Sequence, residues 1–267
     1  MAKTPLKISP FKDHADFEKE IKEFANKYKA IVVNQAKRTS DYFEMSCFNH
    51  VVRYYESLGY SLEVRSLQDG KYRYKCSPSG IQSNFSNFEA SITIKGKIQE
   101  FEIHHNLAVQ SSHDPTIFAT PDISIIKKGA VKYSKTYYDT KTTFSYADNE
   151  DMLSFCEVKH FNPFPELLFN FIGVLNELEK DYLTNDAKDT ILHIAPSLMT
   201  SGKSNKQTNR IQTSLQSRYW INIFYDLFAG GSFAFSKKNS GQIRKAQKRK
   251  AKLTNKSLAK ISLQTAA

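Results

Sequence analysis

Apolar residues recur at helical spacing in two stretches near the start of the chain. Between residues 1 and 38 they predict an amphipathic accessory helix. Its apolar side carries Phe17, Ile21, Phe24 and Tyr28. A second helix is expected to begin at Ser40 and to stop at Gly59, because glycine favours the end of a helix.

The middle of the chain alternates between apolar and polar residues, which predicts strands. We expect them at residues 61–66, 72–76, 90–95, 98–109, 122–127 and 153–161. A glycine-containing turn at residues 95–97 joins two of these strands into a hairpin. The polar, tyrosine-rich segment 129–151 is expected to be an insertion shaped like a β-hairpin.

Helical spacing returns in the last third of the chain. We expect a helix from Pro165 through Leu178, a strand at residues 190–195, and a long helix from Asn205 to about residue 228. The order is then helix, mostly antiparallel strands, helix, strand and helix. This order predicts an α/β fold with a mixed central sheet flanked by helices.

The net charge of +11 is concentrated near the C-terminal end. Residues 237–260 hold ten lysines and arginines and no acid, which leaves 28 basic against 27 acidic residues elsewhere. We therefore divide the chain into the helical segment 1–38, a main domain at 39–231 and a basic, flexible tail at 232–267.

The tail is expected to bind nucleic-acid phosphates without sequence preference, because clustered cations displace the counterions that surround phosphates. The residues expected to do so are Arg244, Lys245, Lys248, Arg249 and Lys250. A nuclear-import signal and a binding surface for an acidic protein are the alternatives.

Composition favours a folded protein of the cell interior. Hydrophobic residues make up 40% of the chain and aromatic residues 13%, which is enough to build a core. No apolar run is long enough to span a bilayer, and the N-terminus lacks the apolar segment of a secretory signal, so no membrane partner is expected. Three separated cysteines without a CxxC pair predict free thiols in a reducing cytoplasm and disfavour a zinc site.

The candidate chemistry lies on two of the expected strands. Asp122 follows a proline at the start of one strand, and Glu157, Val158 and Lys159 lie within another. Residues two apart in a strand share a face, so Glu157 and Lys159 point the same way. Charges amid apolar neighbours are costly unless they are paired or bind a metal. Two carboxylates suit Mg²⁺, with Mn²⁺ as a substitute, and a lysine beside them can orient an attacking water.

The sequence Pro121-Asp122, an intervening segment and Glu157-Val158-Lys159 resembles the motif of the PD-(D/E)XK nucleases, the restriction-endonuclease-like superfamily. The resemblance covers about residues 40–195, where the expected order matches that family's α-β-β-β-α-β core. It implies that Asp122 and Glu157 are metal ligands and that Lys159 is catalytic. It also makes the Val158 carbonyl and Glu44, on the first core helix, candidate ligands.

Two features qualify the motif. Asp122 and Glu157 are 35 positions apart, longer than most members' spacing, so segment 129–151 must be an insertion. An acid followed two residues later by lysine also occurs elsewhere in this chain, at residues 20–22, 139–141 and 186–188. What distinguishes residues 157–159 is their place in an apolar strand, after the Pro-Asp strand and before an apolar helix.

Further candidates lie on neighbouring segments. Glu102 and His104 share a face of the strand before Asp122, and Gln110 is placed on the same face by alternation. Glu102 is an alternative or addition to Glu44. Lys203, in a loop between a strand and a helix, and Arg210, on that helix, are expected to contact a nucleic-acid backbone.

The expected function is that of a Mg²⁺-dependent endonuclease that hydrolyses DNA, in phage defence, restriction or a mobile element. A nuclease-like module that binds nucleic acid or a protein without cutting is the alternative, as is a nuclease acting on RNA. A homodimer or an accessory protein subunit is a candidate requirement for cutting both strands.

Overall fold

The computed structural model describes most of the chain up to residue 227. The described ranges are 14–27, 31–33, 39–94, 96–134, 143–179 and 193–227. The basic tail and the expected strand at residues 190–192 lie outside these ranges, while residues 193–195 of that expectation are described and form no strand. No helix in the described ranges is long and apolar enough to cross a membrane.

A seven-stranded mixed sheet forms the centre of the described structure, in the order β13-β12-β11-β8-β5-β4-β2. Its strands are β2 (Ser61–Arg65), β4 (Asn87–Ile94), β5 (Lys97–His105), β8 (Ile123–Lys127), β11 (Met152–Lys159), β12 (Ser197–Thr200) and β13 (Asn222–Phe224). The strands from β2 to β11 pair antiparallel, and β12 and β13 continue parallel to β11. The expected mixed sheet is therefore confirmed.

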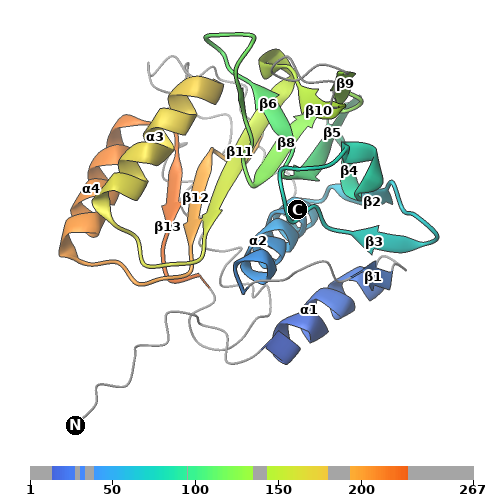
Figure 1. Ribbon diagram of the computed structural model, residues 1–267, viewed down its shortest axis with the longest axis horizontal. Coiled ribbons are helices and arrows are strands. Elements are labelled where there is room, and N and C mark those ends of the chain that lie inside the picture. Colours follow the sequence, from blue (N-terminus) through green and yellow to red (C-terminus); the bar gives the residue numbers. More distant parts are fainter. Residues whose placement is uncertain are drawn as a thin grey trace.

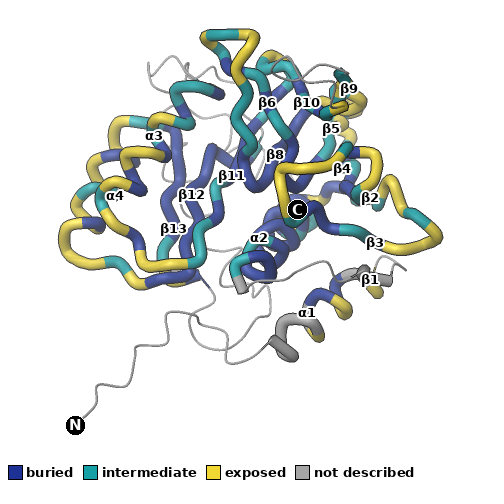
Figure 2. Tube along the Cα trace, viewed as in Figure 1, coloured by how far each residue is buried: buried dark blue, intermediate teal, exposed yellow. Residues whose placement is uncertain are grey.

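Helices cover both faces of this sheet (Figure 1). On one side lies α2 (Thr39–Ser57), with α1 (His14–Lys27) against it. On the other side α3 (Pro165–Glu179) and α4 (Lys206–Arg218) lie next to each other. Figure 2 shows that the central strands are buried between these layers, whereas α3 and α4 expose their outer sides.

The alternation of β11 separates two hydrophobic cores. Cys156 and Val158 belong to the core that contains the apolar side of α2. Phe155 belongs to the core under α3 and α4, where its ring lies 5.9 Å from that of Phe171. Neighbouring residues of a strand point to opposite faces, so these two cores fix which way every side chain of β11 points.

Smaller sheets complete the fold. Two strands, β1 (Ile31–Val33) and β3 (Lys71–Arg73), pair in parallel. A four-stranded sheet has the order β7-β6-β10-β9. Its strands are β6 (Ala108–Gln110), β7 (Phe118–Ala119), β9 (Lys132–Ser134) and β10 (Phe144–Ala147). Because β9 and β10 pair antiparallel, the hairpin expected within segment 129–151 is confirmed.

Several expectations about the elements differ from the structure. Within the described part of the strand expected at residues 190–195, residues 193–195 form no strand and the next strand is β12, and the long last helix stops at Arg218. The buried aromatic and β-branched run after it, which includes Trp220, leads into β13. The single strand expected at 98–109 is divided at Asn106, whose φ of 51° turns β6 out of the central sheet.

The two-core arrangement predicts different costs for two phenylalanine truncations. Phe155→Ala should lower the free energy of unfolding by about 3–5 kcal/mol, because it empties a fully buried position beneath α3. The matched control Phe169→Ala removes a ring that is 53% exposed on α3 and should change stability little. Urea unfolding followed by circular dichroism measures both. Equal losses in the two variants would contradict the assignment of Phe155 to this core.

Candidate functional site

Asp122, Glu157 and Lys159 meet where β8 and β11 stop pairing. The last pair in the ladder between these antiparallel strands joins Cys156 to Ile123. Asp122 comes directly before β8, so continuing the register places it opposite Glu157. The residues that the motif separates by 35 positions are thus brought together by the pairing of two neighbouring strands.

The three side chains form one hydrogen-bonded group. Lys159 Nζ lies 3.0 Å from Asp122 Oδ2 and 2.9 Å from Glu157 Oε2, so one ammonium bridges both carboxylates. Asp122 Oδ2 also accepts a 2.6 Å hydrogen bond from the backbone N–H of Val158. The backbone N–H of Val158 thus contacts Asp122, while the Val158 carbonyl stays a candidate metal ligand.

Burial sets the electrostatics of this group. Burial, followed by the negative charge of Asp122, raises the pKa of Glu157 to about 7 against the opposing effect of Lys159. Burial alone would lower the pKa of Lys159, but the charges of Asp122 and Glu157 outweigh it and raise that pKa. Lys159 is therefore a cation at neutral pH, placed between two acids that repel each other.

The donor set fits a hard divalent cation. Asp122 and Glu157 supply carboxylate oxygens, which are the ligands that Mg²⁺ and Mn²⁺ prefer. The described residues contain no group of three His, Cys, Asp or Glu arranged to hold a metal. A cation held here would complete its shell with backbone carbonyl, water or phosphate oxygens, which is the usual manner of Mg²⁺ and not that of structural zinc.

Glu44 lies on α2 and contacts a different partner. Its Oε2 is 3.7 Å from Nε2 of His105, a buried residue of β5 that pairs with Ile123. Burial and then the charges of Cys156, Glu44 and Asp122 raise the pKa of the Cys47 thiol. Glu44 and Asp122 therefore lie within electrostatic reach of the same buried thiol, at the same end of the sheet.

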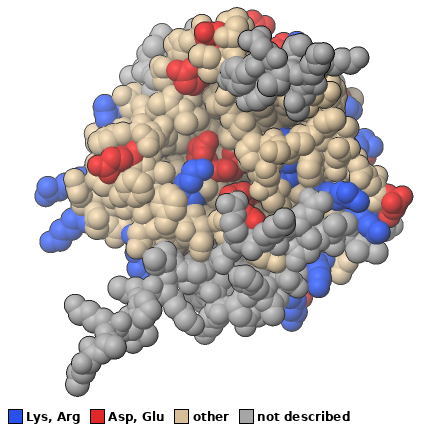
Figure 3. All heavy atoms as spheres, in the orientation of Figure 1, with Lys and Arg blue, Asp and Glu red and all other residues tan. Residues whose placement is uncertain are grey.

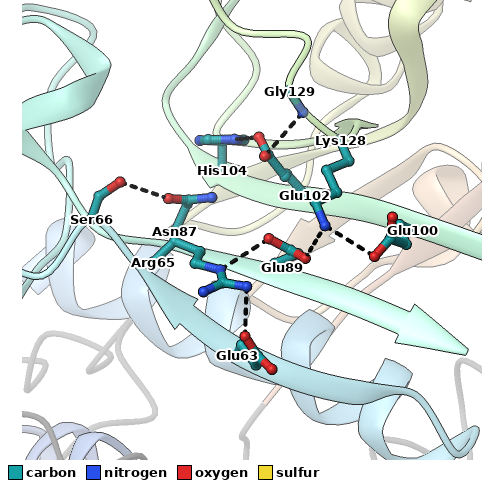
Figure 4. A network of polar contacts seen from close by, with 10 residues as sticks. All are labelled: Glu63, Arg65, Ser66, Asn87, Glu89, Glu100, Glu102, His104, Lys128 and Gly129. Atoms are coloured by element: carbon teal, nitrogen blue, oxygen red, sulfur yellow. Dashed lines mark hydrogen bonds and ion pairs between the residues drawn. The ribbon is translucent and has the colours of Figure 1, made fainter.

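Glu102 and His104 lie together, away from the acid pair. Glu102 accepts hydrogen bonds from the backbone N–H of Gly129 at 3.1 Å and contacts His104 Nε2 at 2.8 Å (Figure 4). Glu102 pairs with Ile126, four residues along β8 from Asp122, which corresponds to roughly 13 Å of strand. The group in Figure 4 continues through Lys128 and Glu89 across β4 and β5, and it ties the turn after β8 to the sheet.

Gln110 does not share a strand face with Glu102, contrary to the expectation from alternation. It belongs to β6, and its Nε2 donates to the Pro115 carbonyl at 2.9 Å. The division of the strand at Asn106 breaks the alternation on which the expectation depended. Asn106 adopts the left-handed conformation, which asparagine tolerates better than most residues, and its N–H donates a long-range hydrogen bond to the Asp122 carbonyl.

The basic candidates lie outside the group of three. Lys203 is exposed, and its backbone N–H donates to Asn162 Oδ1 at 3.0 Å in the loop that follows β11. Arg210 is exposed on α4. The candidates in the tail, Arg244, Lys245, Lys248, Arg249 and Lys250, are outside the described residues. Figure 3 shows acidic and basic side chains meeting near the centre of one face, amid mostly uncharged surface.

The raised pKa of Glu157 predicts how stability depends on pH without divalent cations. A carboxyl with a raised folded-state pKa contributes stability that is lost as pH rises, here between about 4.5 and about 7. Glu157→Gln should therefore become more stable relative to the wild type as pH rises from 4.5 to 8. Urea midpoints in EDTA measure this difference, with exposed Glu150→Gln as the matched control. A difference between Glu157→Gln and wild type that stays constant with pH would contradict it.

Comparison with known proteins adds no relative. No family model, no curated protein and no solved structure matches the chain. The function proposed for this chain therefore rests on the geometry of the strand ends and on the chemistry of their side chains.

Proposed function

We propose that this chain is a Mg²⁺-dependent nuclease of the PD-(D/E)XK superfamily that hydrolyses phosphodiester bonds in DNA. The observation that carries the proposal is the group formed by Asp122, Glu157 and Lys159, in which one ammonium lies 3.0 and 2.9 Å from two carboxylates. Folding does not require two like charges at one strand end, and their proximity raises the pKa of Glu157.

The order of elements around the group supports the proposal. In sequence, α2 precedes the three antiparallel neighbours β5, β8 and β11, which are followed by α3 and then β12 parallel to β11. Apart from β2, β3 and β4, which come between α2 and β5 in sequence, this order agrees with the α-β-β-β-α-β core expected for the restriction-endonuclease-like superfamily. The hairpin of β9 and β10 falls between β8 and β11, and it accounts for the long spacing between the two acids.

The residues of the group suggest a division of labour. A divalent cation, when bound, would polarise the phosphate and lower the pKa of an attacking water. Asp122 and Glu157 would hold it, and the bond from the Val158 N–H fixes one Asp122 oxygen. Lys159 has a raised pKa, so it acts as a proton-bearing donor that orients the water or stabilises charge on the phosphate. Defence against phages, restriction or a mobile element is the biological setting that we propose, by family analogy.

Substitution in the group should abolish metal-dependent cleavage. Asp122→Asn removes a negative ligand and should reduce cleavage to the level seen in EDTA. Lys159→Ala should reduce it by about 10²–10³-fold, the usual cost of losing one donor to a transition state. Asp151→Asn is the matched control, because Asp151 pairs with Lys127 at the opposite end of β11. Gel assays measure cleavage of plasmid, linear and single-stranded DNA and of RNA, with Mg²⁺, Mn²⁺ or EDTA.

The outcomes separate the nuclease from its alternatives. Cleavage of DNA that requires a cation and fails in both site variants supports the proposal. Nucleic-acid binding by the wild-type chain without cleavage under any cation would assign it to a binding module, and cleavage confined to RNA would replace the substrate. Retention of cleavage by Asp122→Asn would show that the group is not the catalytic site.

Deleting residues 237–267 should weaken DNA binding and flatten its dependence on salt. The deleted segment contains ten lysines and arginines, and each phosphate that they neutralise contributes about 0.9 to the slope of log affinity against log salt for duplex DNA. Fluorescence anisotropy over a range of salt concentrations in EDTA measures the slope. An unchanged affinity and slope would exclude the tail from DNA binding.

A further inference from the structure

Two aromatic rings are exposed directly after β11. Phe161 and Phe164 are 38% and 43% exposed, although large apolar side chains are usually buried. Their rings are stacked, with centroids 5.8 Å apart and planes inclined by 30°. The pair therefore presents a connected aromatic surface to solvent instead of contributing to the core.

The ring pair lies beside the candidate catalytic group. Phe161 comes two residues after Lys159, the last residue of β11. The loop after β12 runs alongside it, because Ser201 N–H donates to the Lys159 carbonyl at 3.3 Å and Gly202 N–H donates to the Phe161 carbonyl at 3.2 Å. The rings are thus fixed to the strand end that positions Lys159.

A close backbone contact brings positive charge to the same place. A Cβ on Gly202 would lie 2.4 Å from the Cα of Asn162, so only glycine permits the two loops to approach this closely. Asn162 in turn accepts the backbone N–H of Lys203 at 3.0 Å. Lys203 is exposed, and its backbone is held next to the loop that carries both rings.

The helix that follows extends this positive surface. An Asn205–Thr208 capping box starts α4, and its exposed residues Lys206 and Arg210 are four apart, so they share a face. The sequence of α4 contains no acidic residue. Exposed aromatic rings and cations thus occur together at this edge of the fold.

We propose that Phe161 and Phe164 are a stacking platform for unpaired bases, and that Lys203, Lys206 and Arg210 bind the phosphates of the same strand. The proposal rests on the nuclease function proposed above and names its substrate class, which is nucleic acid with a single-stranded segment at the scissile phosphate. A base within a duplex has both faces covered by its neighbours, so only an unpaired base can stack on these rings. The basic flank favours a nucleic-acid strand over a protein as the occupant.

Binding in EDTA tests the platform in the full chain without depending on cleavage. The probes are single-stranded and duplex oligonucleotides of deoxyribonucleotides or ribonucleotides, each with one 2-aminopurine whose fluorescence falls on stacking. The double variant Phe161→Ala/Phe164→Ala should lose about tenfold or more in affinity for single strands, together with the fluorescence change. Its affinity for duplex should stay at the wild-type value, because the phosphate contacts remain.

Two further variants make the result specific. Phe169→Ala removes a ring of α3 that is more exposed than either platform ring and should leave all affinities unchanged. Phe161→Trp/Phe164→Trp retains aromatic faces and should retain single-strand affinity. The platform is disproved if the double alanine variant binds single strands as tightly as the wild type, if it loses duplex affinity equally, or if the wild type does not bind single strands.

Failure of the platform and failure of the nuclease are distinguishable. A wild-type chain that stacks unpaired bases in EDTA but cleaves nothing with Mg²⁺ or Mn²⁺ supports the platform and refutes the nuclease. Metal-dependent cleavage with unchanged single-strand binding in the double alanine variant supports the nuclease and refutes the platform. The deoxyribonucleotide and ribonucleotide probes show which sugar the platform accepts.

Discussion

The proximity of Asp122 to Glu157 is the constraint on which the site depends. Two buried carboxylates repel each other, and burial together with that repulsion raises the pKa of Glu157 to about 7. Lys159 offsets the repulsion by contacting both. The arrangement requires a fixed register between β8 and β11, because a shift of one residue would turn Glu157 and Lys159 to the opposite face.

The two hydrophobic cores supply that register. Cys156 and Val158 pack in the core on the α2 side, and Phe155 packs beneath α3. If β11 shifted by one residue, apolar side chains would take the positions of charged ones on one face, and charged side chains would enter the hydrophobic core on the other. The group of charges is therefore maintained by apolar packing several residues away, which explains how a destabilising combination of side chains persists at a strand end.

Local patterns predicted the elements that carry the site. The spacing of apolar residues predicts α2 and α3, alternation predicts β8 and β11, and the polar, tyrosine-rich segment 129–151 predicts the hairpin of β9 and β10. The structure contains all of them. The structure also brings Asp122, Glu157 and Lys159 into contact. Strand alternation places Glu157 and Lys159 on one face, and antiparallel pairing places Asp122 opposite Glu157. These features follow from periodicities of two and 3.6 residues, which a sequence displays directly.

Features that depend on distant parts of the chain were not predictable in this way. The apolar pattern of α4 continues through Trp220 into β13, so the sequence does not show where the helix ends. Pairing with β12 makes residues 222–224 a strand. The turn at Asn106, which removes Gln110 from the site, accompanies a hydrogen bond to Asp122. Nothing in the sequence distinguishes Phe161 and Phe164 from buried aromatic residues, and only the structure shows them exposed.

The exposed rings add a second candidate mode of nucleic-acid binding beside the charge of the tail. The excess charge of the chain is in its tail, and a tail attracts any phosphate backbone without regard to structure. In the proposed platform, Phe161, two residues after Lys159, and Phe164 would instead act close to the phosphate that the proposed nuclease cleaves. Since β11 supplies Glu157, Lys159 and the start of the loop with the rings, a base stacked on those rings would hold its own backbone next to the acid pair. In the proposed scheme, attraction by the tail and selection at the strand end would therefore be physically separate steps, one set by charge and the other by whether a base is free to stack.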